Sequence, residues 1–210
     1  MDEKERMEIF KKAKAIIFGH FVYSSGRHGG VYVNKDAIYI DPEWIKLLCE
    51  DIAKHFQEKE IDVVAGPAVG GVILTQWVSY ALSQLTIGDN RVLAVYAEDG
   101  PNETKIFKRG YDKLIPGKKV LIVEDITTTG GSVKKVIDLV KYFNGTIVGV
   151  GLLCNRGGVS TEYLGVEEMF SLISLDLESY EEEDCPLCKD NVPVNTELGK
   201  GAEYLARKKI

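Results

Sequence analysis

The amino-acid sequence predicts an α/β fold with a central, mostly parallel sheet flanked by helices. Four continuous apolar runs of strand length carry this prediction: IDVVAG from residue 61, RVLAVYA from 91, KKVLIVED from 118 and TIVGVGLL from 146. Runs without polar alternation are typical of strands buried on both faces, and helical periodicity follows the first and third runs. Strands that alternate with helices in this way indicate a parallel sheet.

Two amphipathic helices are also predicted in the first 60 residues. Apolar residues recur at helical spacing in two sets, Met7, Phe10, Ala13 and Ile17, and then Trp44, Leu48, Ile52 and Phe56. Asp41 followed by Pro42 predicts the start of the second helix, with an N-cap and a proline in the first turn. Between the helices, residues 21–40 are expected to form short strands around a turn at residues 25–30, in a small irregular lobe.

The element after the third apolar run is the clearest helix of the sheet region. Its apolar stripe consists of Val133, Val136, Ile137 and Val140, and Asn144-Gly145 marks its end. Residues 98–114 lack a strong period and carry glycine, proline, asparagine and several lysines. We therefore predict a long mobile loop there, a flap that contains a short hairpin. The acidic residues 181–184 are predicted to form a solvated turn.

Composition excludes several classes of protein. A chain of 210 residues with 45% apolar and 28% charged content buries a full core, so we do not expect disorder. No apolar run approaches the roughly 20 residues that cross a bilayer, and no signal-like block follows the charged first residues, so we expect a cytoplasmic protein without membrane contact. A net charge of −6 argues against nucleic-acid binding through bulk electrostatics. The cysteine spacing does not match a secreted disulfide scaffold, which favours reduced thiols.

The stretch VLIVEDITTTGGS, residues 120–132, joins the third strand to the following helix. Ligands of open α/β sheets gather at such junctions. Backbone N–H groups of a glycine-rich turn and the positive end of the next helix form an anion pocket, so the loop after the acids suits a phosphate. Glu124 and Asp125 would repel that phosphate, but carboxylates accept hydrogen bonds from vicinal sugar hydroxyls or hold a bridging cation. Neither G-x-x-x-x-G-K-[ST] nor G-x-G-x-x-G is present.

This run resembles the signature of type I phosphoribosyltransferases. In that family two acids hold the ribose 2′- and 3′-hydroxyls of phosphoribosyl pyrophosphate (PRPP), and the next loop binds the 5′-phosphate. The resemblance assigns PRPP binding to Glu124, Asp125, Ile126, Thr127, Thr128, Thr129, Gly130, Gly131 and Ser132. A second matching element, DVVAGPAVGG at residues 62–71, implies that Ala68, Val69 and Gly70 bind the pyrophosphate, with a cis Ala68–Val69 peptide bond. The resemblance also implies Mg²⁺, held mainly by PRPP and by no protein ligand.

Residues 21–34 further resemble the hood of orotate phosphoribosyltransferases, where a Ser-Gly turn and an aromatic strand help to enclose the pyrimidine. The resemblance assigns orotate contacts to Thr128, Arg156 and Tyr32. A guanidinium grips a carboxylate through two parallel hydrogen bonds, which would discriminate orotate from uracil. The alternative is that Arg156 is only a charge on a surface loop. The implied architecture is one type I phosphoribosyltransferase domain over residues 1–210, with a core at 61–157 and a hood from 1–40 and part of the C-terminal region.

The flap departs from the common pattern of this family, in which an Arg-Lys pair, a further lysine and a histidine are frequent. This chain has Lys105, Lys108 and Arg109 there and no histidine. A shorter-flap branch that carries Cys-Pro-Leu-Cys near its C-terminus is more similar. We predict that the three flap cations act on the pyrophosphate as catalytic residues together with Glu124 and Asp125, reaching a neighbouring subunit of a homodimer. The alternative is that they are solvated charges.

The Cys185-Pro-Leu-Cys188 pair has three interpretations. The first interpretation is half of a zinc site. Such a site needs four ligands and therefore two further donors, and no second CxxC or HxxxH spacing exists in the sequence. The three histidines, His20, His28 and His55, are scattered. A redox CxxC normally opens a helix near a strand, whereas Pro186 and the acidic lead-in favour a turn. We favour a structural turn near the dimer or hood.

The predicted reaction converts orotate and PRPP to orotidine 5′-monophosphate and pyrophosphate in pyrimidine biosynthesis, with no nucleic-acid partner. Two alternatives stay open: a phosphoribosyltransferase for a purine such as hypoxanthine or xanthine, and a regulator that senses PRPP on the same fold. Arg156 and the hood argue against the first. The acidic balance and the flap lysines argue against the second.

Overall fold

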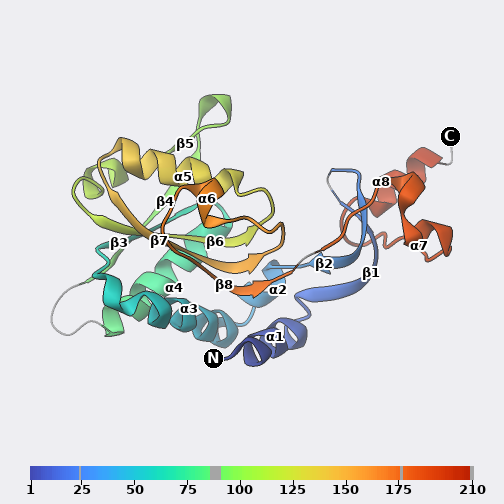
Figure 1. The fold of residues 1–210 in the computed structure, drawn as a ribbon, viewed down its shortest axis with the longest axis horizontal. Coiled ribbons are helices and arrows are strands. Elements are labelled where there is room, and N and C mark those ends of the chain that lie inside the picture. The colour runs from blue at the N-terminus through green and yellow to red at the C-terminus, as the bar shows by residue number, and fades with distance from the viewer. Residues whose placement is uncertain (24, 86–90, 176, 209–210) are drawn as a thin grey trace. The chain divides into compact units, whose positions relative to one another are not determined.

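The computed structural model describes residues 1–23, 25–85, 91–175 and 177–208 (Figure 1). The chain divides into two compact units, of which the larger comprises Met1–Arg6 with Asp41–Leu175 and the smaller Met7–Ile40 with Asp176–Ile210. Among the described residues, every helix is too short or too polar to cross a bilayer.

The larger unit contains a six-stranded sheet in the order β5-β4-β3-β6-β7-β8. Its strands are β3 (Val63–Pro67), β4 (Leu93–Asp99), β5 (Lys105–Ile106), β6 (Lys119–Thr127), β7 (Thr146–Asn155) and β8 (Met169–Ser174). All neighbours pair in parallel except β5, which turns back antiparallel on β4. The four predicted strands and the short flap hairpin are confirmed, whereas β8 was not predicted.

Helices cover both faces of this sheet. In Figure 1, α5 (Gly131–Tyr142) lies on one face, and α3 (Pro42–Phe56) and α4 (Gly70–Leu85) lie on the other. A one-turn helix, α6 (Thr161–Leu164), follows β7. The predicted stripe of α5 is confirmed, because all four residues are buried in one core cluster with alternate residues of the strands: Val133, Val136, Ile137 and Val140. Burial on both sides explains the continuous apolar runs of the strands.

Helix α3 begins and packs as its sequence predicts. Asp41 is the N-cap, with its Oδ1 accepting a hydrogen bond from the Glu43 amide at 2.9 Å, and Pro42 opens the first turn. On its buried side the helix approaches β7 where that strand carries glycine. A Cβ on Gly151 would lie 2.7 Å from the Ile52 side chain, so a side chain at this position would displace the helix.

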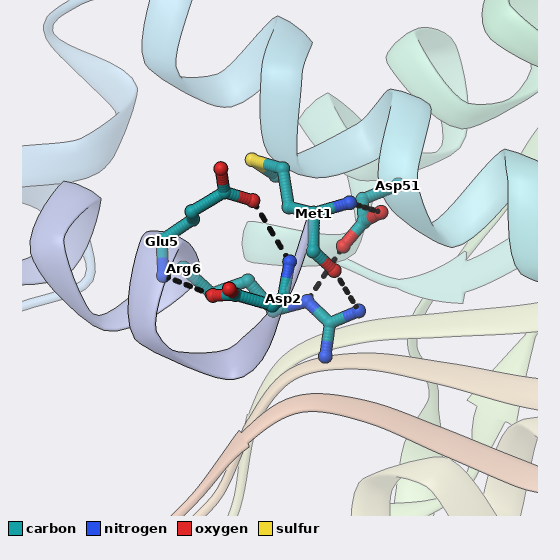
Figure 2. Close-up of polar contacts among 5 residues, drawn as sticks. All are labelled: Met1, Asp2, Glu5, Arg6 and Asp51. Atoms are coloured by element: carbon teal, nitrogen blue, oxygen red, sulfur yellow. Dashed lines mark hydrogen bonds and ion pairs between the residues drawn. The ribbon is translucent and has the colours of Figure 1, made fainter.

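The first residues of the chain are fastened to α3 by a buried carboxylate (Figure 2). Asp51 accepts from the Met1 amino group at 2.8 Å and from Arg6 Nε at 2.6 Å, and its side chain is 8% exposed. Asp2 and Glu5 bond reciprocally to one another's backbone amides at 2.9 and 2.8 Å, which satisfies donors at the start of α1 (Glu3–Lys12).

Two elements near the N-terminus differ from prediction. Helix α1 ends at Lys12, and Ile17 lies in β1 (Ile16–Val22), so the helical period beyond Lys12 was wrong. Lys14 has a left-handed φ of 54°, a conformation that ends a helix. The end of the predicted strand region, residues 36–40, instead holds the one-turn helix α2 (Asp36–Tyr39), which buries Ile38.

In the smaller unit, β1 pairs antiparallel with β2 (His28–Val33), which confirms two strands around a turn. The turn is shorter than predicted, because His28, Gly29 and Gly30 belong to β2. Ser24 lies outside the described residues. The C-terminal part contributes α7 (Pro186–Lys189) and α8 (Gly201–Lys208), and the acidic turn at Glu182–Asp184 is exposed as predicted. The expectation that the cysteine pair has no further donors is wrong. Antiparallel pairing brings His20 and His28 together beside Cys185 and Cys188.

Candidate active site

The predicted site lies at the carboxyl ends of β3, β6 and β7, which are parallel neighbours. From β3 the chain runs to β4 on one side, and then returns to β6 on the other side of β3. The strand order therefore reverses between β3 and β6. Helices that start on opposite faces leave a crevice at such a point, where open α/β sheets bind ligands.

Glu124 and Asp125 lie buried near the carboxyl end of β6, with 7% and 3% exposure. Side chains alternate along a strand, so Glu124 continues the α5-facing series of Ile122, whereas Asp125 lies on the opposite face. Glu124 Oε1 accepts from the Asp125 amide at 3.1 Å, and Asp125 Oδ1 accepts from the Ile126 amide at 2.6 Å. These bonds fix two carboxylates on either side of the strand end.

The β6–α5 loop combines exposed hydroxyls with a helix N-terminus. Thr128, Thr129 and Ser132 are exposed, while Thr127 is buried. Gly130 precedes α5 with a left-handed φ of 77°, and a Cβ there would lie 2.8 Å from the Tyr163 ring. The N-cap of α5 is Gly130, which has no side chain, and the Gly131 amide makes only a long bond of 3.5 Å to Thr129 Oγ1. The first amides of α5 therefore keep donors for an anion at the positive end of the helix dipole.

The β3–α4 loop lies directly against the acidic pair. The Ala68–Val69 peptide bond is cis, as predicted, and the Ala68 amide donates to the Ala97 carbonyl at 2.8 Å. Gly70 then begins α4, and a Cβ on Gly70 would overlap the carboxylate of Asp125. Only a residue without a side chain allows this approach, so the two loops meet at Asp125.

The third loop of the site follows β7. The Arg156 amide donates to the Thr127 carbonyl at 2.8 Å, and a Cβ on Gly157 would overlap the carbonyl of Thr128. Arg156 is half-buried. The structure therefore brings Arg156 to the loop that carries Thr128, while the contacts of both residues with orotate stay predictions.

Asn155 shapes this third loop, and the sequence reasoning missed it. Its Nδ2 donates to the Val159 carbonyl at 2.8 Å, and its Oδ1 accepts from the Val159 amide at 3.1 Å. The pair of bonds closes the turn that presents Arg156. Gly158, near the end of this turn, has a left-handed φ of 63°. Asn155 before Arg-Gly-Gly was a readable signal, because asparagine and glycine favour tight turns.

The flap cations pair with acids of their own segment. Lys105 Nζ lies 2.6 Å from Asp99 Oδ1, Lys108 Nζ lies 2.8 Å from Glu98 Oε2, and Arg109 also contacts the Glu98 carboxylate. The hydrogen bond from Lys105, followed by its charge, lowers the pKa of Asp99. Binding of a pyrophosphate by these cations would require them to exchange carboxylate partners.

Tyr32, the remaining predicted base contact, belongs to the smaller unit. It is half-buried on β2, where its ring lies 5.4 Å from that of Phe21 in a tilted arrangement. Its contact with a base stays a prediction.

Comparison with known proteins gives one consistent result. A phosphoribosyl transferase domain model matches residues 34–173. The chain is 38% identical over 194 residues to an orotate phosphoribosyltransferase of Caldanaerobacter subterraneus subsp. tengcongensis, covering 92% of this chain and 96% of the relative. Identity to the same enzyme of Thermotoga maritima is also 38%, over 92% of this chain and 97% of that one. A crystal structure of orotate phosphoribosyltransferase from Aeropyrum pernix is similar with a TM-score of 0.63 and 25% identity, covering 80% and 92% of the two chains.

Proposed function

The chain belongs to the phosphoribosyl transferase domain family, and we propose from this premise how its residues transfer the 5-phosphoribosyl group of PRPP to orotate. The products are orotidine 5′-monophosphate and pyrophosphate, in pyrimidine biosynthesis. The observation that carries the site assignment is the meeting of three loops around a buried acidic pair beside the start of α5, where the N-cap is a glycine.

PRPP binding divides between the strand end and the helix start. Glu124 and Asp125 accept hydrogen bonds from the ribose 2′- and 3′-hydroxyls, because ionised carboxylates only accept. The backbone amides of Asp125 and Ile126, which donate to Glu124 Oε1 and Asp125 Oδ1, hold the two carboxylates in place. The loop at residues 126–132 holds the 5′-phosphate with its hydroxyls and the first amides of α5. Charge repulsion keeps the phosphate away from the acids and so sets the direction of the ribose.

Orotate binds against the third loop. Arg156 grips the orotate carboxylate through two parallel hydrogen bonds, and Thr128 and Tyr32 contact the base. This role of Arg156 is supported by the hydrogen bond from its backbone amide to the Thr127 carbonyl, which holds the Arg156 backbone beside the loop at residues 126–132. Uracil lacks the carboxylate and leaves the half-buried guanidinium without that partner, so it is a poor substrate.

Catalysis needs no protein nucleophile. The ring nitrogen of orotate attacks the anomeric carbon as the bond to pyrophosphate breaks, so the main contribution of the protein is to align the two substrates. Positive charge develops on the ribose ring in this step, and the negative potential of Glu124 and Asp125 stabilises it. Closure of the flap excludes water that would hydrolyse the activated sugar.

The departing pyrophosphate is met by the β3–α4 loop and the flap. Ala68, Val69 and Gly70 line the pyrophosphate; the Ala68 amide keeps its bond to the Ala97 carbonyl, so the backbone donors come from the amides that follow it. Lys105, Lys108 and Arg109 release the carboxylates of Asp99 and Glu98 and bind the pyrophosphate oxygens instead. The oxygen-rich surroundings of Glu124 and Asp125 fit a hard cation such as Mg²⁺, held mainly by PRPP itself. When bound, Mg²⁺ supplies charge neutralisation on the leaving group. A homodimer and a cytoplasmic location stay predictions.

A base-panel assay tests this function. Protein, Mg²⁺ and PRPP are mixed with orotate, hypoxanthine or xanthine in turn, and pyrophosphate release is followed. We expect release with orotate alone. Release with a purine but not with orotate would replace the substrate assignment, and PRPP binding without release with any base would favour the sensor.

A further inference from the structure

Four side chains of the smaller unit converge outside the proposed active site. His20 lies on β1, His28 opens β2, Cys185 is the N-cap of α7 and Cys188 lies within α7. Each directs one nitrogen or sulfur atom inward, and these four atoms all lie within 4.8 Å of one another. His20, His28 and Cys185 are 2%, 0% and 0% exposed, and Cys188 is half-buried.

The distances are those of a tetrahedral site with two nitrogen and two sulfur ligands. His20 Nε2 lies 2.9 Å from His28 Nδ1, 3.7 Å from Cys185 Sγ and 3.6 Å from Cys188 Sγ, while Cys188 Sγ lies 3.3 Å from His28 Nδ1. Around a zinc ion with ordinary bond lengths, a tetrahedron separates nitrogen from sulfur by about 3.6 Å and two nitrogens by about 3.3 Å. The four separations given above differ from these values by at most a few tenths of an ångström, and the remaining two lie within 4.8 Å.

Hydrogen bonding orients the His20 ring for metal ligation. His20 Nδ1 lies 2.8 Å from the Val192 carbonyl, which only accepts, so the proton sits on Nδ1 and the Nε2 lone pair faces the cluster. The proton shared between the rings must then come from His28 Nδ1. That arrangement leaves the buried His28 Nε2 as a lone pair with no hydrogen-bond donor among the described residues. Ligation through Nδ1 would place the proton on Nε2, which has no hydrogen-bond acceptor among the described residues, in a ring that packs edge-to-face with Tyr204.

The C-terminal part of the smaller unit also lacks an apolar anchor. Within residues 177–208, Cys185 and Gly201 are the only buried residues. The segment meets the β1–β2 hairpin through isolated bridges at the two histidines, His20 to Val194 and His28 to Tyr180. Small units with little apolar burial commonly depend on a metal or a disulfide, so a metal at the histidines would fasten the segment where it meets the hairpin.

We propose that His20, His28, Cys185 and Cys188 bind one Zn²⁺ ion that joins the C-terminal segment to the β1–β2 hairpin. Two imidazoles and two thiolates suit zinc, and four protein ligands in a buried setting leave no open position for a substrate. The site is therefore structural and separate from the Mg²⁺ that accompanies PRPP. Binding releases the protons of the two thiols and changes no oxidation state.

Metal analysis of the purified full chain tests the proposal. Protein prepared without chelator is expected to carry one zinc per chain by mass spectrometry of the metal. The Cys185→Ser, Cys188→Ser double variant is expected to carry less than a tenth of that amount. His55→Asn is the matched control, because His55 is the third histidine and bonds to Glu168 in the larger unit. It should keep the full amount.

Cobalt gives a spectroscopic readout that is independent of catalysis. Wild-type protein stripped of zinc and loaded with Co²⁺ should show thiolate-to-cobalt charge-transfer absorption and the strong visible bands of a tetrahedral site. Cys188→His keeps four ligands, so it should still bind one metal with roughly half of the charge-transfer intensity. This variant gives an answer even if the double variant does not fold.

Three results would overturn the proposal. One is wild-type protein that holds no zinc and shows no cobalt absorption. Another is full zinc content in the double variant. The third is a Cys185–Cys188 disulfide in freshly purified protein alkylated without reductant. Orotate turnover decides none of these outcomes, so the zinc site and the proposed function fail or stand separately.

Discussion

Asp125→Asn is the sharpest single test of the acidic pair. The substitution keeps the shape of the side chain, and an amide oxygen still accepts from the Ile126 amide, as Asp125 Oδ1 does at 2.6 Å. The other position changes from an anionic acceptor to an NH₂ donor, which opposes the hydroxyl of a ribose. The side chain is 3% exposed, so little bulk water is available to compensate.

The expected magnitude follows from the loss of one hydrogen bond to a charged group. Such a bond contributes about 1.5–3 kcal/mol, which corresponds to a fall in kcat/KM for PRPP of about 10- to 150-fold. The melting temperature should stay within about 3 °C of wild type, because the substitution is isosteric. Steady-state pyrophosphate release and a thermal melt measure the two quantities.

Asp138→Asn is the matched control for this variant. Asp138 lies on α5 with a side chain that is 61% exposed, and its nearest cation, Lys134, is 3.6 Å away. An exposed pair of this kind contributes little, so kcat/KM should stay within about twofold of wild type. Wild-type kcat/KM in folded Asp125→Asn protein would refute the ribose-holding role.

Three further changes test other parts of the site and the fold. Gly70→Ala places a methyl group on the carboxylate of Asp125, so kcat/KM for PRPP should fall by about tenfold or more; unchanged kinetics would contradict the contact of the two loops. Arg156→Lys cannot form two parallel hydrogen bonds, so the KM for orotate should rise by about tenfold and discrimination against uracil should shrink, which competition assays measure. The hydrogen bond from Lys59, assisted by His55, lowers the pKa of Glu168 in the folded protein. The stabilisation by ionised Glu168 is therefore complete above the pKa of the unfolded chain and is lost as the pH falls through the pKa of the folded protein. The free energy of unfolding of wild type in urea should exceed that of Glu168→Gln at neutral pH, and this difference should narrow below about pH 4. A difference that stays constant from pH 7 to pH 3 would contradict this linkage.

The sheet and the position of the β6–α5 loop were predictable because their signals are local. Continuous apolar runs specify buried parallel strands, and the change from Ile122-Val123 to Glu124-Asp125 marks where the core ends. The stripe of α5 and the Asp41–Pro42 start of α3 are likewise written within one or two turns of chain. Near the N-terminus, Ala13 and Ile17 continue the helical spacing of apolar residues past Lys12 by chance. Ile17 instead lies in β1, where it pairs with Tyr32 of β2.

Contacts between distant residues were not predictable in the same way. The approach of Gly70 to Asp125 depends on two loops from different strands, and the sequence shows only that each loop has a glycine. The meeting of His20 and His28 with the cysteine pair depends on antiparallel pairing and on a segment more than 150 residues away. Residue spacing along the chain therefore concealed the two histidines that the fold brings to the cysteine pair.

A crystal structure with PRPP bound would test the central claim most directly. We predict the 5′-phosphate at residues 128–132, against the start of α5, with the ribose 2′- and 3′-hydroxyls within hydrogen-bond distance of Glu124 and Asp125. A phosphate bound elsewhere, or a ribose that does not contact either carboxylate, would contradict the proposed site.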